Sequence, residues 1–235
     1  MNLILLQPDD FISECRVRLS DHRREHIQKV HRAEVGAILS VGLLNGNMGT
    51  GTLVGINETS VELEVELKHA PPPALPLTLI LALPRPKMLK RTLQTITAMG
   101  VKKLVLINSY RVEKSYWQTP ILNPENLREQ LILGLEQAKD TILPEVRIEK
   151  RFKPFVEDEL KSLIAGTRAL LAHPKTDELC PSQIHEPATL AIGPEGGFIE
   201  YEVEKLTEIG FGAVHIGPRI LRVENAVPAL LARLF

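Results

Sequence analysis

A proline-rich stretch at residues 71–76 divides this 235-residue chain into two parts with different hydrophobic patterns. Proline fixes the backbone angle φ and has no N–H to donate, so four prolines in six residues do not fit inside a helix or a central strand. Such a run favours a stiff, extended connector. The sequence therefore predicts a first domain over residues 1–70, a linker over 71–76 and a second domain over 77–235.

The first part has mainly the pattern of β-strands. Over residues 61–67, apolar side chains alternate with glutamates, which is typical of a strand with one buried and one solvent-facing side. Residues 37–43 and 51–56 predict two further strands joined by a hairpin loop. Ser20 is the expected N-cap of a short helix over 20–31. Together these segments predict a small β-barrel or sandwich with one helix.

Strands and helices alternate in the second part. Short apolar runs predict strands at residues 77–83, 103–108, 146–148, 168–172, 189–192 and 213–216. Periodic apolar faces predict helices at residues 87–99, from Pro124 after Asn123 as N-cap, and from Val223 onward. This alternation predicts an α/β domain with a mostly parallel sheet and helices on both faces.

Two glycine-bearing turns each follow a predicted strand and open a helix-like segment. The first spans Ile192–Phe198 (IGPEGGF) and the second His215–Ala226 (HIGPRILRVENA). Glycine lets backbone groups approach a ligand closely, and open α/β sheets bind ligands beyond the carboxyl ends of their strands. A single turn of this kind is more often an ordinary connection between elements. Two such turns, the second running into an Arg-x-x-Arg-x-Glu cluster, favour a small-molecule site.

Composition narrows the class of protein. A net charge of −1 gives no global attraction to nucleic acid or membrane, so such a partner needs a local patch. Cys15 and Cys180 form no C-x-x-C pair, which argues against a disulfide framework or a zinc site and suits a reducing compartment. The first eight residues lack the features of a signal peptide, and no apolar run reaches the length of a membrane span. We therefore expect a cytoplasmic protein with no metal and no membrane partner.

Positive charge gathers in residues 16–32, where six cations face two acids. A basic stripe on a small barrel would suit RNA phosphates, but a solvated helix face explains it equally well. Three histidines in this stretch do not share one helical face, so we predict no metal site there. The candidate RNA-binding residues are Arg16, Arg18, Arg23, Arg24, Lys29 and Arg32.

The two glycine motifs together closely resemble the signature of the ribosomal RNA small subunit methyltransferase E (RsmE) family, of the SPOUT class. The resemblance runs along the whole chain but is looser in the first part. It implies an α/β fold in which a SPOUT-type, trefoil-knotted domain follows a PUA-like, RNA-binding β-barrel. It also implies S-adenosylmethionine as methyl donor, N3 of a uridine in 16S rRNA or the small ribosomal subunit as acceptor, and a homodimer.

Within this resemblance, chemistry suggests roles for individual residues. Arg222 is the candidate for stabilising the uracil anion, because a fixed cation is effective where negative charge develops. Glu224 is expected to orient that arginine or accept the proton, unless it only complements the helix dipole. The expected cofactor-binding residues are Leu171, Ala172, His173, Ile192, Gly193, Pro194, Glu195, Gly196, Gly197, Ile216, Gly217, Pro218, Ile220, Leu221 and Arg222.

The last predicted helix has a wide apolar face, formed by Val223, Val227, Leu230, Leu231 and Leu234. Such a face must be buried on its own domain or on a partner, and the resemblance favours a partner.

Three departures from the family pattern stand out. Asn225 replaces the usual threonine, Lys139-Asp140 stands where a Ser-Gly-Arg run is common, and Pro84-Arg85-Pro86 is unusually rich in proline. Asn225 leaves open an alternative, a non-catalytic RNA-binding protein that retains the SPOUT fold. A nicotinamide- or flavin-linked enzyme is disfavoured because no G-x-G-x-x-G follows a first strand.

Overall fold

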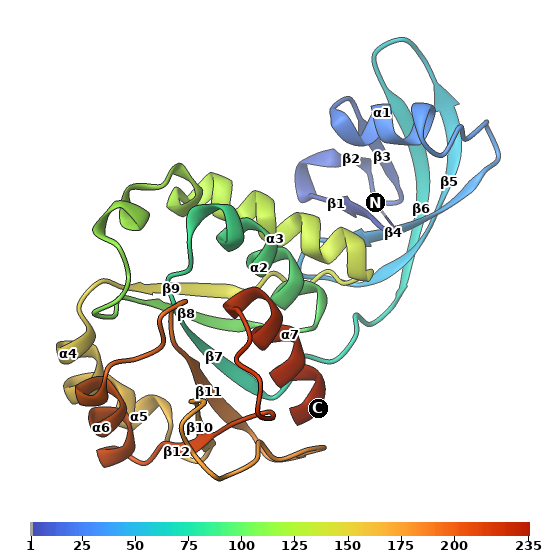
Figure 1. Cartoon of the computed structure of the whole chain (residues 1–235). Helices are drawn as coiled ribbons and strands as arrows, with labels where there is room; N and C mark the ends of the chain where they lie inside the picture. Colours follow the sequence, from blue (N-terminus) through green and yellow to red (C-terminus); the bar gives the residue numbers. More distant parts are fainter. Residues whose placement is uncertain (1) are drawn as a thin grey trace. The chain divides into compact units, whose positions relative to one another are not determined.

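The computed structural model describes residues 2–235, and the chain forms two compact units. The first unit comprises Met1–Pro73 together with Leu131–Leu143. The second comprises Ala74–Gln130 and Pro144–Phe235. Figure 1 shows both units along the chain from blue to red. A segment far along the sequence is thus part of the first unit.

The first unit is built on a curled six-stranded sheet in the order β1-β4-β5-β6-β3-β2. Its strands are β1 (Ile4–Leu6), β2 (Phe11–Ser13), β3 (Arg16–Leu19), β4 (Ile38–Leu43), β5 (Met48–Ile56) and β6 (Val61–His69). β1 and β4 pair in parallel, and the other neighbours are antiparallel. The predicted alternation in residues 61–67 is confirmed, since Val61, Leu63 and Val65 are buried among the core residues of this sheet.

The one α-helix between β3 and β4 is shorter than the pattern predicts. Helix α1 spans His22–Lys29, and its N-cap is Asp21, whose carboxylate accepts from the backbone N–H of Arg23. The expectation that Ser20 caps this helix is wrong. Strand β3, which carries Arg16 and Arg18, was not predicted from the sequence. Short 3-10 turns, such as η1 (Pro8–Asp10), complete this part.

The end of helix α3 (Pro124–Ala138) belongs to the first unit and packs against its first strand. Leu135 shares a small core with Leu3 and Leu5. The carbonyl of Glu136 accepts from the backbone N–H groups of Asn2 and Leu3, both at 3.0 Å. The residues that follow α3 close the contact, because the hydroxyl of Thr141 donates to the carbonyl of Gly46 at 2.5 Å and Asn45 donates to the carbonyl of Thr141.

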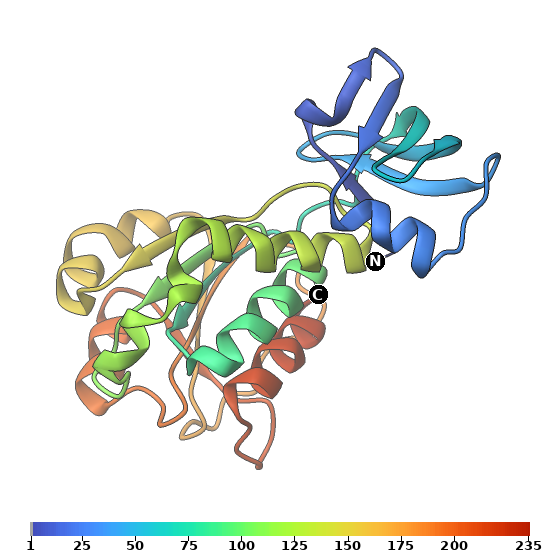
Figure 2. The same ribbon diagram turned by 90° about the horizontal axis from the view of Figure 1, so that it is seen from above.

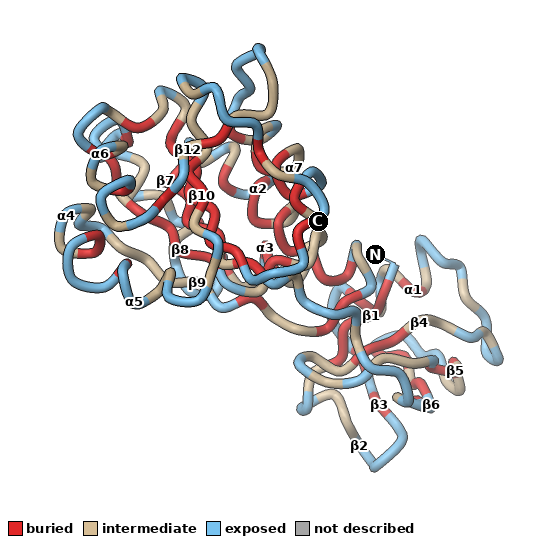
Figure 3. The backbone as a smooth tube through the Cα atoms, turned by 90° about the horizontal axis from the view of Figure 1, so that it is seen from below, coloured by how far each residue is buried: buried red, intermediate tan, exposed pale blue. Residues whose placement is uncertain are grey.

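The second unit is an all-parallel six-stranded sheet in the order β12-β10-β11-β7-β8-β9. Its strands are β7 (Leu77–Ala82), β8 (Lys103–Ile107), β9 (Glu145–Glu149), β10 (Arg168–Ala172), β11 (Ala188–Ile192) and β12 (Gly212–Val214). Most side chains of its central strands are buried, and the tube through β7 is largely red in Figure 3. Because every strand runs the same way, all carboxyl ends meet at one edge of the sheet. The predicted parallel α/β domain is confirmed.

Helices cover both faces of this sheet. α2 (Pro86–Ala98) and α7 (Val223–Leu234) lie side by side on one face (Figure 1 and Figure 2). α4 (Phe152–Pro154), the π-helical segment η4 (Phe155–Leu160), α5 (Lys161–Leu163) and α6 (Glu200–Glu208) lie on the other side. Two 3-10 turns, η2 (Lys114–Gln118) and η3 (Pro120–Leu122), precede α3.

The apolar face of α7 is already buried within its own unit. Val223, Val227, Leu230, Leu231 and Leu234 are each at most 4 % exposed in the single chain, and α7 packs against α2. The expectation that this face is covered by a partner is therefore wrong. A fully buried helix face gives no information about oligomeric state.

Candidate active site

A cavity of about 320 Å³ lies beyond the carboxyl ends of three neighbouring strands, β10, β11 and β12. Its size is typical of small-molecule sites, and most of its lining is glycine backbone and aliphatic side chain. The lining residues are Ala172, His173, Pro174, Lys175, Ile192, Gly193, Pro194, Glu195, Gly196, Gly197, Val214, His215, Ile216, Gly217, Arg219, Ile220, Leu221, Val223, Ala226 and Leu230. The two glycine turns therefore meet at one cavity.

The first turn, residues 193–197, requires glycine at two positions. A Cβ atom at Gly193 would lie 2.9 Å from the backbone nitrogen of Phe198 and 3.1 Å from its ring. Gly197 has φ +73, the left-handed region that side chains disfavour. Its N–H donates to the carbonyl of Pro194 at 2.7 Å, which closes the turn. The tight turn leaves backbone groups at the wall of the cavity.

The second turn is held by a histidine that forms part of the wall. His215 Nδ1 lies 3.1 Å from the backbone N–H of Gly217 and accepts from it. Gly217 has φ +139, again a conformation that suits glycine. The backbone of His215 also bonds to Glu178 and Cys180, so the loop after β10 is fixed beside this turn. His215 therefore shapes the cavity from both its side chain and its backbone.

His173 follows β10 and contributes the only other imidazole in the lining. Burial lowers its pKa below the usual value, and the nearby Lys175 lowers it further. Burial therefore favours the uncharged form of this ring.

Twelve of the fifteen expected cofactor residues line the cavity. Leu171 is fully buried inside β10, and Pro218 and Arg222 also stand outside the lining. Sequence reasoning missed Val223, Ala226 and Leu230, whose spacing of three and four places them on one face of α7. Val223 and Leu230 also belong to the apolar face that the sequence analysis assigns to a dimer contact, whereas Ala226 does not. Lys175 was also missed as a residue of the lining. Arg219 falls within the predicted second turn and lines the cavity too.

Arg222 and Glu224 lie where the cavity meets the start of α7. Arg222 is the N-cap residue, and its carbonyl accepts from Asn225 and Ala226 at 2.9 and 2.8 Å. The side chain of Arg222 is exposed, and Glu224 stands half-buried in the first turn of the helix. Asn225 is exposed. The positive end of the helix dipole points toward this place.

Two arginines from neighbouring loops hold the first glycine turn. The carboxylate of Glu195 accepts from the backbone N–H of Arg85 at 3.2 Å and from its Nε at 3.3 Å. The guanidinium of Arg111 donates to the carbonyl of Gly196. The pairing of Glu195 with Arg85 therefore helps to shape the loop. The loops after β7 and β8 thus reach the turn that follows β11.

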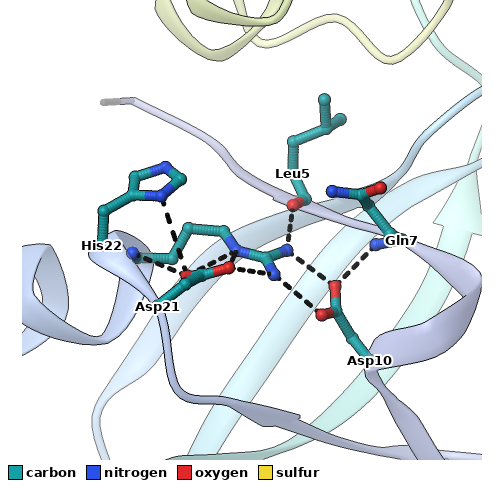
Figure 4. Close-up of polar contacts among 6 residues, drawn as sticks. Leu5, Gln7, Asp10, Asp21 and His22 are labelled. Carbon is teal, nitrogen blue, oxygen red and sulfur yellow. Dashed lines mark hydrogen bonds and ion pairs between the residues drawn. The ribbon is translucent and has the colours of Figure 1, made fainter. Parts of the chain in front are cut away.

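The basic stretch 16–32 does not form the stripe that its composition suggests. Arg23 is 5 % exposed and donates to Asp10 at 2.6 and 2.7 Å, to Asp21 at 2.7 and 3.0 Å, and to the carbonyl of Leu5 at 2.7 Å. Figure 4 shows the carboxylates of Asp10 and Asp21 and the backbone oxygen of Leu5 directed at one guanidinium, that of Arg23. Burial alone would lower the pKa of Arg23, but the hydrogen bonds to Asp21 and Asp10 raise it above its usual value. The expectation that Arg23 contacts RNA is wrong, because its guanidinium is buried and paired with Asp10 and Asp21.

The other cations of this stretch are mostly paired as well. Glu62 pairs with Arg18 at 2.8 Å and with Arg16 at 3.8 Å. Lys29 pairs with Glu25 at 3.1 Å, and Arg24 donates to the carbonyl of Glu58. Within residues 2–235, Arg32 is the one candidate of the six that makes no such bond through its side chain.

Among the described residues, no cluster of three or more His, Cys, Asp or Glu is placed to hold a metal ion. Within the same residues, no helix is both long and apolar enough to cross a membrane.

The RNA methyltransferase domain family matches residues 71–235, which is more than half of the chain. A protein of Treponema pallidum named ribosomal RNA small subunit methyltransferase E is 29% identical over 99% of this chain and 90% of its own length. A protein of Borreliella burgdorferi with the name ribosomal RNA small subunit methyltransferase E 1 is 25% identical over 97% of this chain and 95% of its own.

Among solved structures, a ribosomal RNA small subunit methyltransferase E from Neisseria gonorrhoeae bound to S-adenosyl methionine superposes with a TM-score of 0.75. It is 24% identical, and the match covers 99% of this chain and 95% of that one. At this identity the likeness concerns the fold, and it confirms a SPOUT-type domain with a PUA-like barrel. With the match across residues 71–235 and relatives of one name along almost the full length, the chain belongs to the RNA methyltransferase family, in its ribosomal RNA small subunit methyltransferase E branch.

Proposed function

We propose that this protein transfers a methyl group from S-adenosylmethionine to N3 of a uridine in 16S rRNA. The observation that carries the proposal is the cavity between two glycine turns at the carboxyl edge of a parallel sheet, in a chain of the RNA methyltransferase family. The protein is an RNA-modifying enzyme that uses S-adenosylmethionine, in line with the names of its relatives and the cofactor bound to its structural neighbours.

The cavity fits this cofactor in size and in chemistry. Backbone groups of the turns at 193–197 and 216–217 would hold the adenine and ribose, while Ile192, Val214 and Leu230 supply apolar contact. Lys175 and Arg219 on the lining would pair with the carboxylate of the methionine part. The neutral His173 adds no charge against the sulfonium. The bound cofactor supplies an already activated methyl group.

The chain's own residues then have to place the acceptor and stabilise charge. Holding donor and acceptor in line supplies much of the barrier reduction in well-oriented systems, on the order of 7–11 kcal/mol. As N3 of uracil loses its proton, negative charge develops on the ring, and Arg222 at the positive end of α7 would stabilise it. Glu224, in the first turn of the same helix, would orient Arg222 or accept the proton.

We also propose that the protein acts as a homodimer. The family resemblance supports this, together with Ile220, which lines the cavity yet is 82 % exposed in the single chain. A second copy covering the loop around Ile220 would shield the reacting atoms from water. Light scattering at micromolar concentration should give twice the chain mass, and an active monomer would contradict the proposal.

Nucleoside mass spectrometry of 16S rRNA from cells with and without the gene tests the proposed reaction. We expect N3-methyluridine to disappear when the gene is absent and to return when it is restored. Isothermal calorimetry with S-adenosylmethionine tests the site separately. If the protein binds S-adenosylmethionine but the rRNA nucleosides are the same with and without the gene, the non-catalytic RNA-binding alternative is favoured.

A further inference from the structure

The two units of this chain differ in charge in a way that bears on where RNA binds. The first unit carries eight Lys and Arg against twelve Asp and Glu, whereas the second carries 20 against 17. The barrel is therefore acidic overall, and most cations of its basic stretch are paired. An RNA strand needs accessible positive charge, and the second unit offers more of it.

Four exposed cations stand together on the carboxyl edge of the second sheet. The loops after β7, β8 and β9 hold Arg85, Arg111, Lys150 and Arg151, and Glu113 is the one acid within these loops. Arg85 also pairs with Glu195 of the first glycine turn. We call these four residues the basic rim. The strands end level with one another, since Leu81 pairs with Leu106 and Leu106 with Ile148. The three loops therefore emerge beside one another.

An aromatic side chain is held out from the middle of this rim. Tyr110 and Arg111 are the central residues of a turn closed by a 3.0 Å bond from Val112 N–H to the carbonyl of Ser109. Ser109 and Val112 are buried, yet Tyr110 is 80 % exposed. The two buried residues, Ser109 and Val112, therefore fix a turn that holds the Tyr110 side chain in solvent.

A buried carboxylate fixes the position of this turn. Glu202 is 3 % exposed, and its two oxygens accept from the backbone N–H of Tyr110 at 2.7 Å and of Ile199 at 3.0 Å. Glu202 thereby joins the tyrosine turn to the residue that caps α6. Because α6 follows the first glycine turn, Tyr110 is held in a fixed place relative to the cofactor cavity.

Contacts on three sides bring the rim to the cavity wall. Arg85 bonds to Glu195 and Arg111 bonds to the carbonyl of Gly196, both on the first glycine turn. On the third side, the ring of Phe152, next to Arg151 in sequence, lies 6.3 Å from the ring of Phe198. The basic rim and Tyr110 are therefore immediate neighbours of the turn that lines the cavity.

We propose that the basic rim and Tyr110 form the surface on which the substrate RNA strand lies, with Tyr110 stacking on a base beside the target uridine. Single-stranded RNA is bound by cations along its backbone and by aromatic rings that stack on splayed bases. The rim supplies both. In this chain it carries more of the RNA affinity than the barrel residues 16–32. The inference rests on the proposed function, because it takes RNA as the substrate.

Tyr110→Ala tests the stacking contact. RNA affinity is measured with unmodified 16S rRNA transcribed in vitro and with small subunits purified from cells lacking the gene. We expect Tyr110→Ala to weaken binding about tenfold or more, the typical effect of removing one stacked ring, and Tyr110→Phe to bind like the wild type. Tyr201→Ala, which removes another exposed tyrosine on α6, is the matched control. Equal affinity of Tyr110→Ala and wild type would overturn the proposal.

The charge contribution is tested by two double variants with equal changes in charge. Lys150→Ala with Arg151→Ala removes two rim cations that make no contact to the glycine turn in the described structure, and Arg16→Ala with Arg18→Ala removes two from the barrel. We expect the rim pair to lower the slope of log affinity against log salt by about 0.7 for each lost phosphate contact. The barrel pair should change it less, and the reverse order would overturn the proposal.

Failure of this inference and failure of the proposed function give different results. If the wild type binds S-adenosylmethionine and methylates rRNA but the rim variants bind RNA normally, only the role of the basic rim is overturned. If the wild type binds neither S-adenosylmethionine nor either form of rRNA, the proposed function itself is contradicted.

Discussion

Arginine is concentrated in two regions of this protein, and the structure uses it in opposite ways. In the barrel, Arg23 is buried between Asp10 and Asp21, and Arg16 and Arg18 share Glu62. At the carboxyl edge of the second sheet, Arg151 and Arg222 are exposed. The first group holds a fold together, while the second is available to a ligand.

The difference lies in the neighbours that each fold supplies. Antiparallel pairing of β3 with β6 sets Arg18 directly opposite Glu62, so the register of the sheet itself neutralises the charge. A parallel sheet gathers loops from distant parts of the chain at one edge. Cations on those loops meet few acids there. A count of charges along the sequence therefore says little about which of them can bind an anion.

The largest expected effect concerns the buried arginine of the barrel. Arg23→Ala leaves two carboxylates without their cation, and breaking a buried pair in this way costs about 3–5 kcal/mol. We expect a loss of that order in the free energy of unfolding by urea. Arg32→Ala is the matched control and should leave stability unchanged. An Arg23→Ala protein of normal stability but weakened RNA affinity would reverse the comparison.

At the carboxyl edge, Arg222→Ala should act on turnover instead of stability. Removing one charge-stabilising group lowers the rate by roughly two orders of magnitude or more. Cofactor and RNA should still bind within a small factor, and the urea midpoint should not move. Single-turnover methylation assays measure the step directly, and a near-normal rate would take Arg222 out of the proposed chemistry.

The next effect separates two glycines of one turn. Gly193→Ala places a Cβ atom 2.9 Å from the backbone of Phe198, so the turn must shift, at a strain of about 1–3 kcal/mol. S-adenosylmethionine affinity should fall about tenfold or more. Gly196→Ala meets only the flexible stem of Arg111, at 2.8 Å, and should cost less. Calorimetry measures the affinity of both variants for S-adenosylmethionine. Equal losses of affinity would mean that the Arg111 side chain yields no more than the backbone of Phe198 does.

A buried acid of the barrel unit gives a pH effect that the exposed edge should not show. Glu136 is 3 % exposed, and burial raises its pKa from 4.5 to about 7. Between these values the folded protein holds a proton that the unfolded chain has lost. Stability should therefore fall as pH rises through this window, by up to about 1.4 kcal/mol per pH unit. Glu136→Gln should flatten that dependence in urea titrations, and an unchanged slope would contradict the assignment.

The smallest effect concerns a cation whose backbone matters more than its charge. Lys139 has φ 56 just after α3, where the left-handed conformation favours glycine. Lys139→Gly should stabilise the protein by about 0.5 kcal/mol, since relief of strain slightly exceeds the added freedom of the unfolded chain. Thermal melts at one pH compare it with Lys139→Ala, which should not stabilise.

Much of the fold was predictable because its signals are local. Apolar runs predicted all six strands of the second sheet, and glycine turns at 193–197 and 216–217 predicted the cavity. The burial of Arg23 was not predictable, because its partner Asp10 lies on another turn and only the closed sheet brings the two together. The same holds for Glu202, which looks like an ordinary helix residue until its contact with Tyr110 is seen. The knot follows from resemblance alone.

The strand order also determines when the cavity can form during synthesis. β11 lies between β7 and β10, so Leu81 in β7 has no partner on that side until Ile192 has been synthesised, about half of the chain later. The wall then needs α7 as far as Leu230. The main core of the barrel, by contrast, is drawn from residues 4–65. A nascent chain therefore leaves the ribosome with its barrel core complete long before it can bind a methyl donor, so the cofactor cannot assist the early steps of folding.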